Sequence, residues 1–220
     1  MICLSEDPET GGTLMVMALA RCGSLDQMRY PQKHWRSVLR HADWLTDQLR
    51  NLHALGYIHR DLHPGNVMFL NPSSNDDPDV DCIEPYLIDV GVSYSTTDVY
   101  GHRGAYGRLE YLPPEVFEAK PQTQPSDVYC LGTLLWQLVV GSPPRGISST
   151  AVRDNPGGLR EELIPGAPSW FNDILRSCWN PDPDQRPSAA SLWETVQVFL
   201  HSLFSNQHVD RVLSMLMWLL

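Results

Sequence analysis

The sequence has few lysines, no excess of positive charge, no paired cysteines and no long apolar run. Only two of its 220 residues are lysines, Lys33 and Lys120, and its formal net charge at pH 7 is -10. Because nucleic-acid-binding proteins present a basic face, we expect no nucleic-acid partner. The five cysteines are scattered, without a C-x-x-C pair. This usage is typical of reduced thiols and predicts a cytoplasmic protein.

The lack of long apolar runs argues against a transmembrane segment, which needs about 20 mostly apolar residues. Residues 1–13 contain three acidic side chains, so we expect no signal peptide. The composition is 42% hydrophobic, which at this length is enough for one substantial core. Neither an internal repeat nor an interdomain linker is visible in the sequence.

Hydrophobic periodicity predicts more helix than strand. Helices are expected over residues 36–55, 128–140, 169–179 and 188–203. Short apolar strands are expected over residues 2–4, 13–20, 67–70 and 85–88. Loops rich in polar residues or glycine are expected over residues 71–84, 92–112 and 141–168. The predicted fold class is therefore α+β, mainly α.

Some of these segments carry further signals. The run over 13–20 is apolar at nearly every position, which predicts a buried strand. The helix over 128–140 is apolar on every side, which predicts a central, buried position. Ser188 is expected to N-cap the final helix. Apolar residues recur at helical spacing near the C-terminus, which predicts an amphipathic tail over 204–220.

The most informative run is H-R-D-L-H-P-G-N at residues 59–66, between a predicted helix and a predicted strand. It places the carboxylate of Asp61 and the amide of Asn66 at the two ends of one short loop. A second carboxylate, Asp89, follows the next strand in the run D-V-G. Phosphoryl transfer uses such groups, because a carboxylate accepts the acceptor's proton and oxygen ligands hold Mg²⁺. We therefore predict Asp61, Asn66 and Asp89 as catalytic residues, with Asn66 and Asp89 as metal ligands.

Two further motifs lie downstream, Y-L-P-P-E at residues 111–115 and C-W-N-P-D-P-D-Q-R-P-S at residues 178–188. Together with the loop and D-V-G, they resemble the C-terminal lobe of a eukaryotic protein kinase of the tyrosine-kinase-like group. The resemblance implies a truncated protein kinase domain over residues 1–203. Within it, residues 1–20 would be a small-lobe strand remnant and hinge, and residues 21–203 the large lobe.

The same resemblance implies roles for residues around the loop. His59 and Arg60 would be structural members of the loop itself. Glu115 would form an ion pair with Arg186, the arginine of the C-W…R-P-S string. Asp127 is expected to N-cap the central helix and to hydrogen-bond the backbone of the loop, which would preorganise the catalytic residues.

A nucleotide site is also implied, although a plain core strand would explain the same residues. The run from Met17 to Ala20 resembles the strand and hinge that receive adenine. Met17 would be the gatekeeper, the backbone of Ala18 and Ala20 would bond the purine edge, and Met68 would form its floor. The implied cofactors are ATP and Mg²⁺, and the implied partner is a protein substrate. His63 stands where Ser/Thr kinases usually have a lysine that helps to neutralise the γ-phosphate.

The lysine count limits the function that this resemblance implies. The family's small lobe carries a Gly-rich loop, a lysine in a V-A-x-K context and a helical glutamate. Lys33 follows the hinge and Lys120 follows Y-L-P-P-E, so neither matches that lysine. We expect a fragment of a protein kinase, weak or inactive as it stands, which a partner or the missing small lobe would complete.

Three functions remain open at this point. A Ser/Thr kinase is favoured over a tyrosine kinase, because Glu110-Tyr111 lacks the usual tryptophan and residues 63–65 lack the usual arginine. A non-catalytic pseudokinase-type binding or regulatory module is the alternative. A small-molecule phosphotransferase is opposed by Glu115, Arg186 and the C-W…R-P-S string.

Overall fold

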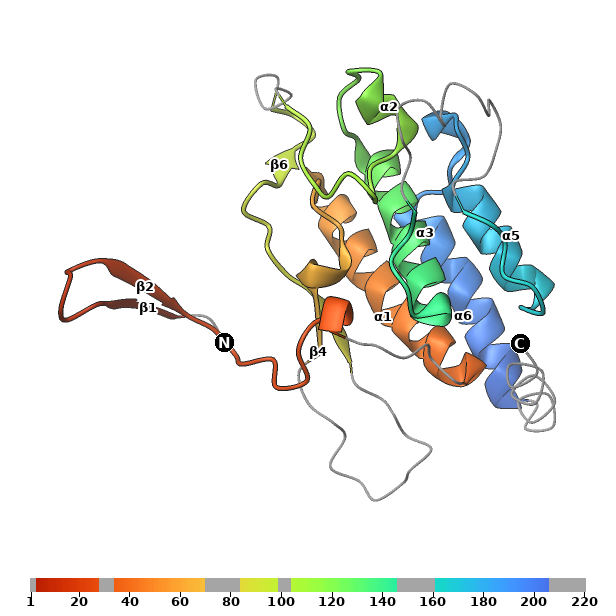
Figure 1. The fold of residues 1–220 in the computed structure, drawn as a ribbon, viewed down its shortest axis with the longest axis horizontal. Coiled ribbons are helices and arrows are strands. Elements are labelled where there is room, and N and C mark those ends of the chain that lie inside the picture. Colours follow the sequence, from red (N-terminus) through yellow and green to blue (C-terminus); the bar gives the residue numbers. More distant parts are fainter. Residues whose placement is uncertain (1–2, 28–33, 70–83, 99–103, 146–160, 206–220) are drawn as a thin grey trace.

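A lobe of packed helices forms the body of the molecule, which is known from a computed structural model (Figure 1). The structure describes residues 3–27, 34–69, 84–98, 104–145 and 161–205. Its longer helices are α1 (Trp35–Ala54), α3 (Gln124–Val140), α5 (Ser169–Cys178) and α6 (Ala189–Ser205). Helix α1 packs against α3 and α6, and α3 also packs against α5. The predicted mainly helical fold is confirmed.

Helix α3 lies at the centre of this lobe, as its apolar sequence predicted. Every residue from Ser126 to Val139 is buried. The helix begins differently from the prediction, because Thr123 and not Asp127 is its N-cap. Thr123 and Ser126 form a reciprocal capping box, which satisfies the first free N–H groups. The side chain of Asp127 is therefore available for contacts outside its own helix.

Short strand pairs flank the helices. Strand β3 (Tyr57–Ile58) pairs with β6 (Tyr94–Ser95), and β4 (Val67–Phe69) pairs with β5 (Pro85–Leu87), both antiparallel. Strand β6 lies inside the segment that was predicted as a loop over 92–112. The short helix α2 (Pro114–Phe117) and the 3-10 turns η1 (Leu25–Gln27), η2 (Pro64–Asn66) and η3 (Pro183–Gln185) complete the described elements.

The N-terminal hairpin stands apart from the helices (Figure 1). It consists of β1 (Cys3–Glu6) and β2 (Thr13–Val16), paired antiparallel with Cys3 opposite Val16. The predicted strand over 13–20 is therefore shorter than expected, and its burial was wrong, because Met15 is 61% exposed. An isolated two-stranded hairpin has no second layer on which to bury its apolar side chains.

Several predictions fall partly outside the described residues. These concern most of the loops over 71–84 and 141–168, and the amphipathic tail beyond Ser205. The final helix does start after Ser188, whose hydroxyl accepts a hydrogen bond from the Ser191 N–H at 3.1 Å. Within the described residues, no helix combines the length and hydropathy needed to cross a bilayer.

Candidate active site

The loop that carries Asp61 is held by one buried carboxylate. The two oxygens of Asp127 accept hydrogen bonds from the backbone N–H groups of His59 (2.7 Å) and Arg60 (2.9 Å). His53 Nε2 lies 2.9 Å from Asp127 Oδ2. Arg60 has a φ of 71°, which is uncommon for any residue but glycine. The predicted contact between Asp127 and the loop is present, and it fixes a strained backbone directly before Asp61.

Asp61 and Asn66 face each other across the loop. The amide Nδ2 of Asn66 donates hydrogen bonds to the Asp61 carbonyl oxygen at 2.9 Å and to its Oδ2 at 3.1 Å. The turn η2 brings the two residues together. Asn66 is buried, whereas Asp61 is only half-buried. The carboxylate is therefore oriented by the protein and still open on one side to an incoming hydroxyl.

The end of strand β5 is tied to the same loop from both sides. The Ile88 N–H donates to the Asn66 carbonyl at 2.9 Å, and His59 Nε2 lies 3.2 Å from the Ile88 carbonyl. Asp89 follows directly and is exposed, with a φ of 63°. Its Oδ1 accepts a hydrogen bond from the Gly91 N–H at 3.1 Å. The backbone of Asp89 thus lies beside the loop, while its side chain makes this local contact with Gly91.

The oxygen atoms of Asn66 and Asp89 suit a magnesium ion. Because Asn66 uses Nδ2 for both of its bonds to Asp61, its Oδ1 is the atom that would reach a metal. Mg²⁺ prefers carboxylate and carbonyl oxygens and keeps ligands from water and phosphate. Val90, the residue after Asp89, is 59% exposed and does not pack in the core.

His63 is a neutral neighbour of Asp61. Its Nδ1 accepts the Gly65 N–H at 3.0 Å, so the ring proton lies on Nε2, which is 3.4 Å from Asp61 Oδ1. Burial, and then the positive charge of Arg108, lower the pKa of His63 below its ordinary value of 6.5. The Nε2 edge of the ring thus faces Asp61, and its surroundings disfavour a positive charge on the ring.

Arg60 is enclosed by residues that the sequence did not reveal. Its guanidinium lies between the rings of Tyr94 and Tyr106, at 4.5 and 4.2 Å from their centroids. Its Nη2 donates to the Gly104 carbonyl at 3.0 Å. The buried Gln122 donates to the carbonyls of both Arg60 and Tyr106 and joins the two segments. Aromatic and amide residues in a loop carry no local signal of such long-range packing.

The predicted nucleotide residues are divided between two environments. Met17 is 60% exposed and Ala18 is exposed, because β2 already ends at Val16. Ala20 is half-buried, and its carbonyl accepts the Gly23 N–H at 3.3 Å. Met68 on β4 pairs with Ser24 in an isolated antiparallel bridge. Met68 therefore lies beside the segment after the hinge, whereas Met17 and Ala18 lie on an open surface.

Glu115 and Arg186 form the predicted ion pair beside the first turn of α3, where the Ser126 hydroxyl also donates to Glu115 Oε1 at 2.8 Å. Arg186 Nη1 and Nη2 donate to Glu115 Oε1 at 2.7 Å and Oε2 at 2.8 Å. Both side chains are buried. Such a two-pronged contact is the strongest geometry available to this pair of groups.

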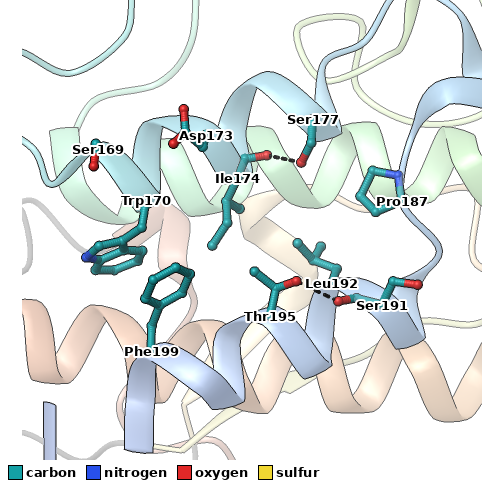
Figure 2. A pocket seen from close by; sticks show the side chains of 10 residues that line it. All are labelled: Ser169, Trp170, Asp173, Ile174, Ser177, Pro187, Ser191, Leu192, Thr195 and Phe199. Atoms are coloured by element: carbon teal, nitrogen blue, oxygen red, sulfur yellow. Dashed lines mark hydrogen bonds between the residues drawn. The ribbon is translucent and has the colours of Figure 1, made fainter. Parts of the chain in front are cut away.

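A separate groove lies between α5 and α6 (Figure 2). Its volume is about 470 Å³. Its larger apolar walls come from Trp170, Ile174, Leu192 and Phe199. The hydroxyls of Ser177 and Thr195 donate back to carbonyls of their own helices, at 2.8 Å each. The groove therefore lacks the converging acid and amide groups of the loop, and we assign no chemistry to it.

A carboxylate, an amide and a second acid around one preorganised loop match the requirements of phosphoryl transfer. Residues 7–198 match the family model described as protein kinase domain. The chain belongs to the protein kinase family. The family predicted from the motifs is thus confirmed, and so is the kinase-like lobe.

The relatives of this kinase domain include eukaryotic and bacterial proteins. It is 30% identical over 208 residues to mitogen-activated protein kinase kinase kinase 11 of Homo sapiens, covering 89% of this chain and 23% of that protein. It is 34% identical over 168 residues to serine/threonine-protein kinase PkaA of Streptomyces coelicolor, covering 70% of this chain and 28% of that protein. The chain thus spans less than a third of the length of these relatives.

Proposed function

We propose that this chain takes part in the transfer of the ATP γ-phosphoryl group to hydroxyls of proteins. The observation that carries this proposal is the contact of Asn66 Nδ2 with Asp61 in a loop that Asp127 holds. The half-buried Asp61 carboxylate would orient the acceptor hydroxyl and take its proton. The oxygen–phosphorus bond to the acceptor forms as the bond to ADP breaks, and ADP leaves with the electron pair.

ATP and Mg²⁺ are the proposed cofactors. Bound Mg²⁺ would neutralise charge on the β- and γ-phosphates, and Asn66 Oδ1 and the Asp89 carboxylate are the proposed ligands. We assign the adenine to the hinge, with the backbone of Ala18 and Ala20 at the purine edge, Met17 as the gatekeeper and Met68 as the floor. The bridge between Ser24 and Met68 supports this assignment, because it brings the floor residue beside the segment that directly follows the hinge.

The hinge assignment requires a covering layer on the N-terminal hairpin. On the hairpin, Leu4 and Met15 lie opposite each other and are 70% and 61% exposed, and Leu19, beyond the end of β2, is 77% exposed. Exposed apolar residues in such a group are characteristic of an interaction surface. We propose that a small lobe, from the same or another chain, packs on this hairpin and covers the nucleotide.

Serine and threonine are the proposed acceptors. The relative from Streptomyces coelicolor is named a serine/threonine-protein kinase, and the sequence around Tyr111 lacks the tryptophan typical of tyrosine kinases. We also propose a cytoplasmic location, which Cys22 and Cys178 support because neither forms a disulfide.

A pseudokinase-type binding module is the second candidate. The exposed positions of Met17 and Ala18 and the scarcity of lysine favour it. The two candidates differ in one observable, because a binding module would hold nucleotide or protein without any transfer that depends on Asp61.

The deciding experiment follows γ-labelled ATP during a long incubation with a generic protein substrate. We expect slow transfer that disappears in Asp61→Asn, and label recovered on serine or threonine after hydrolysis. Asp173→Asn is the matched control, since Asp173 is an exposed partner of Arg176 on α5. Transfer that is equal in Asp61→Asn and wild type would contradict the proposed function and favour the binding module.

A further inference from the structure

During phosphoryl transfer, the loop around Asp61 has to accommodate two negative groups close together. The transferred group is strongly negative, and it must approach a carboxylate that is negative as well. Fixed positive groups at such a place are a large part of catalysis. The Nε2 atom of His63 lies 3.4 Å from Asp61 Oδ1, but its Nδ1 accepts the Gly65 N–H and the ring is therefore neutral. Positive charge in addition to that of the proposed Mg²⁺ would therefore come from a residue other than His63.

Arg60 is unsuited to this task although it adjoins Asp61. It is buried, and its guanidinium is enclosed by Tyr94 and Tyr106. It also donates to the Gly104 carbonyl. To reach a phosphoryl group it would have to leave this packing. Its contacts make it a structural residue that links the loop to the segment before α2.

Arg108 approaches the loop from that same segment. A Cβ atom built on the neighbouring Gly107 would lie 3.2 Å from the Arg60 carbonyl oxygen and 3.7 Å from Asp61 Oδ1. The backbone at Gly107 therefore lies directly against Asp61. Arg108 Nη2 lies 2.5 Å from the position that a Cβ atom on Gly65 would occupy. The absence of a side chain at Gly65 makes room for the guanidinium.

The Arg108 guanidinium also lies beside the neutral histidine. The position that a Cβ atom on Gly65 would occupy lies 2.9 Å from His63 Cε1 and 2.5 Å from Arg108 Nη2. The two side chains therefore meet above Gly65. One cation thus stands next to a ring whose Nε2 atom lies 3.4 Å from Asp61 Oδ1.

The present partner of Arg108 can be exchanged. Its Nη1 lies 2.5 Å from Asp26 Oδ2 on η1, and the two side chains are 41% and 35% exposed. Ion pairs with this exposure contribute little to stability. A guanidinium binds phosphate oxygens through paired N–H groups, which makes a phosphoryl group a strong competitor for the carboxylate.

We propose that Arg108 exchanges Asp26 for the γ-phosphoryl group and supplies the positive charge that His63 does not carry. This inference rests on the proposed function of the Asp61 loop. It adds a residue from outside the loop to the groups that touch the transferred phosphoryl.

The test compares the affinities of the full chain for Mg-ADP and for a non-hydrolysable Mg-ATP analogue by calorimetry. Arg108→Ala should lower the affinity for the analogue by about tenfold and leave the affinity for Mg-ADP unchanged, because only the γ-phosphate loses a contact. His63→Lys added to Arg108→Ala should restore the affinity for the analogue. Asp26→Asn should strengthen it, since Arg108 then loses its competing partner.

Arg176→Ala is the matched control, because Arg176 is an exposed, ion-paired arginine on α5. It should leave both affinities unchanged. If Arg108→Ala lowered the affinities for Mg-ADP and for the analogue equally, the effect would be structural, and the inference would be overturned. Unchanged affinities in Arg108→Ala would overturn it as well, while loss of transfer in Asp61→Asn would leave the proposed function standing. Transfer that survives in Asp61→Asn would instead refute the proposed function.

Discussion

Arg186 and Glu115 lie 71 residues apart in the sequence and form a buried, two-pronged ion pair. Arg186 also donates to the carbonyls of Pro125 at 3.1 Å and Asn180 at 2.8 Å. Glu115 Oε1 accepts the hydroxyl of Ser126 at 2.8 Å. The pair thus connects α2, the first turn of α3 and the turn before α6, and each guanidinium nitrogen and each carboxylate oxygen has at least one partner within this junction.

Truncating Arg186 should therefore be strongly destabilising. Arg186→Ala leaves the Glu115 carboxylate buried without its cation, and we expect the free energy of unfolding to fall by about 3–5 kcal/mol. Urea denaturation of the variant and the wild type measures this difference. Arg176→Ala removes an exposed pair on α5 and should change the value by less than about 1 kcal/mol. Similar losses in both variants would contradict the structural role of the buried pair.

Gly132 should be irreplaceable in the central helix. A Cβ atom at this position would lie 2.5 Å from Cys178 Cβ and 3.3 Å from Trp179 Nε1. Alanine favours a helix by about 1 kcal/mol over glycine, but overpacking a core costs about 1–3 kcal/mol. We expect Gly132→Ala to lower the melting temperature. A higher melting temperature would mean that α5 can move away from α3 without cost.

Motif spacing predicted the long-range contacts of the site better than local features predicted its surroundings. The pairing of Glu115 with Arg186 followed from a family resemblance, because both residues stand inside extended motifs. Residues such as Gln122 and Arg108 stand in no such motif. Their contacts arise because the segment over 104–123 folds back onto the loop. Neither hydrophobic periodicity nor motif spacing in the sequence predicts the course of that segment.

Burial and capping were harder to predict for a related reason. The apolar run over 13–20 predicts a buried strand, but burial needs a second layer, and a run of apolar letters does not say whether one is present. Asp127 suits an N-cap position by residue type. Thr123 and Ser126 take that role, and Asp127 instead binds two N–H groups of the loop more than 60 residues away.

The titration of His63 should report the position of Arg108. Burial and the charge of Arg108 hold the pKa of His63 below 6.5. We expect a histidine resonance with a lowered pKa in an NMR titration, and a rise toward 6.5 in Arg108→Ala. An unchanged pKa in that variant would mean that the guanidinium is not close to the ring in solution.

The same shift has a consequence for stability. Between pH 6.5 and the lower folded pKa, the unfolded chain binds more protons at this histidine than the folded chain does. The contribution of His63 to the free energy of unfolding is therefore fully present above pH 6.5 and is lost as the pH falls. His63→Gln should reduce this acid-dependent loss, which denaturation curves at pH 7 and pH 5.5 would measure.

The activity of the 220-residue polypeptide should be limited by charge at the α- and β-phosphates. Lys120 is paired with Glu118 at 2.6 Å and is 63% exposed at the end of α2, and Lys33 lies outside the described residues. Neither is a candidate for the lysine that clamps these phosphates in the family. We expect the polypeptide to transfer label from ATP barely above background. A compatible small lobe fused upstream of Ile2 should restore turnover, and Asp61→Asn in that fusion should abolish it. Robust transfer by the unfused polypeptide that vanishes in Asp61→Asn would show that the lysine clamp is dispensable, and that Asp61, the metal ligands and Arg108 provide enough stabilisation alone.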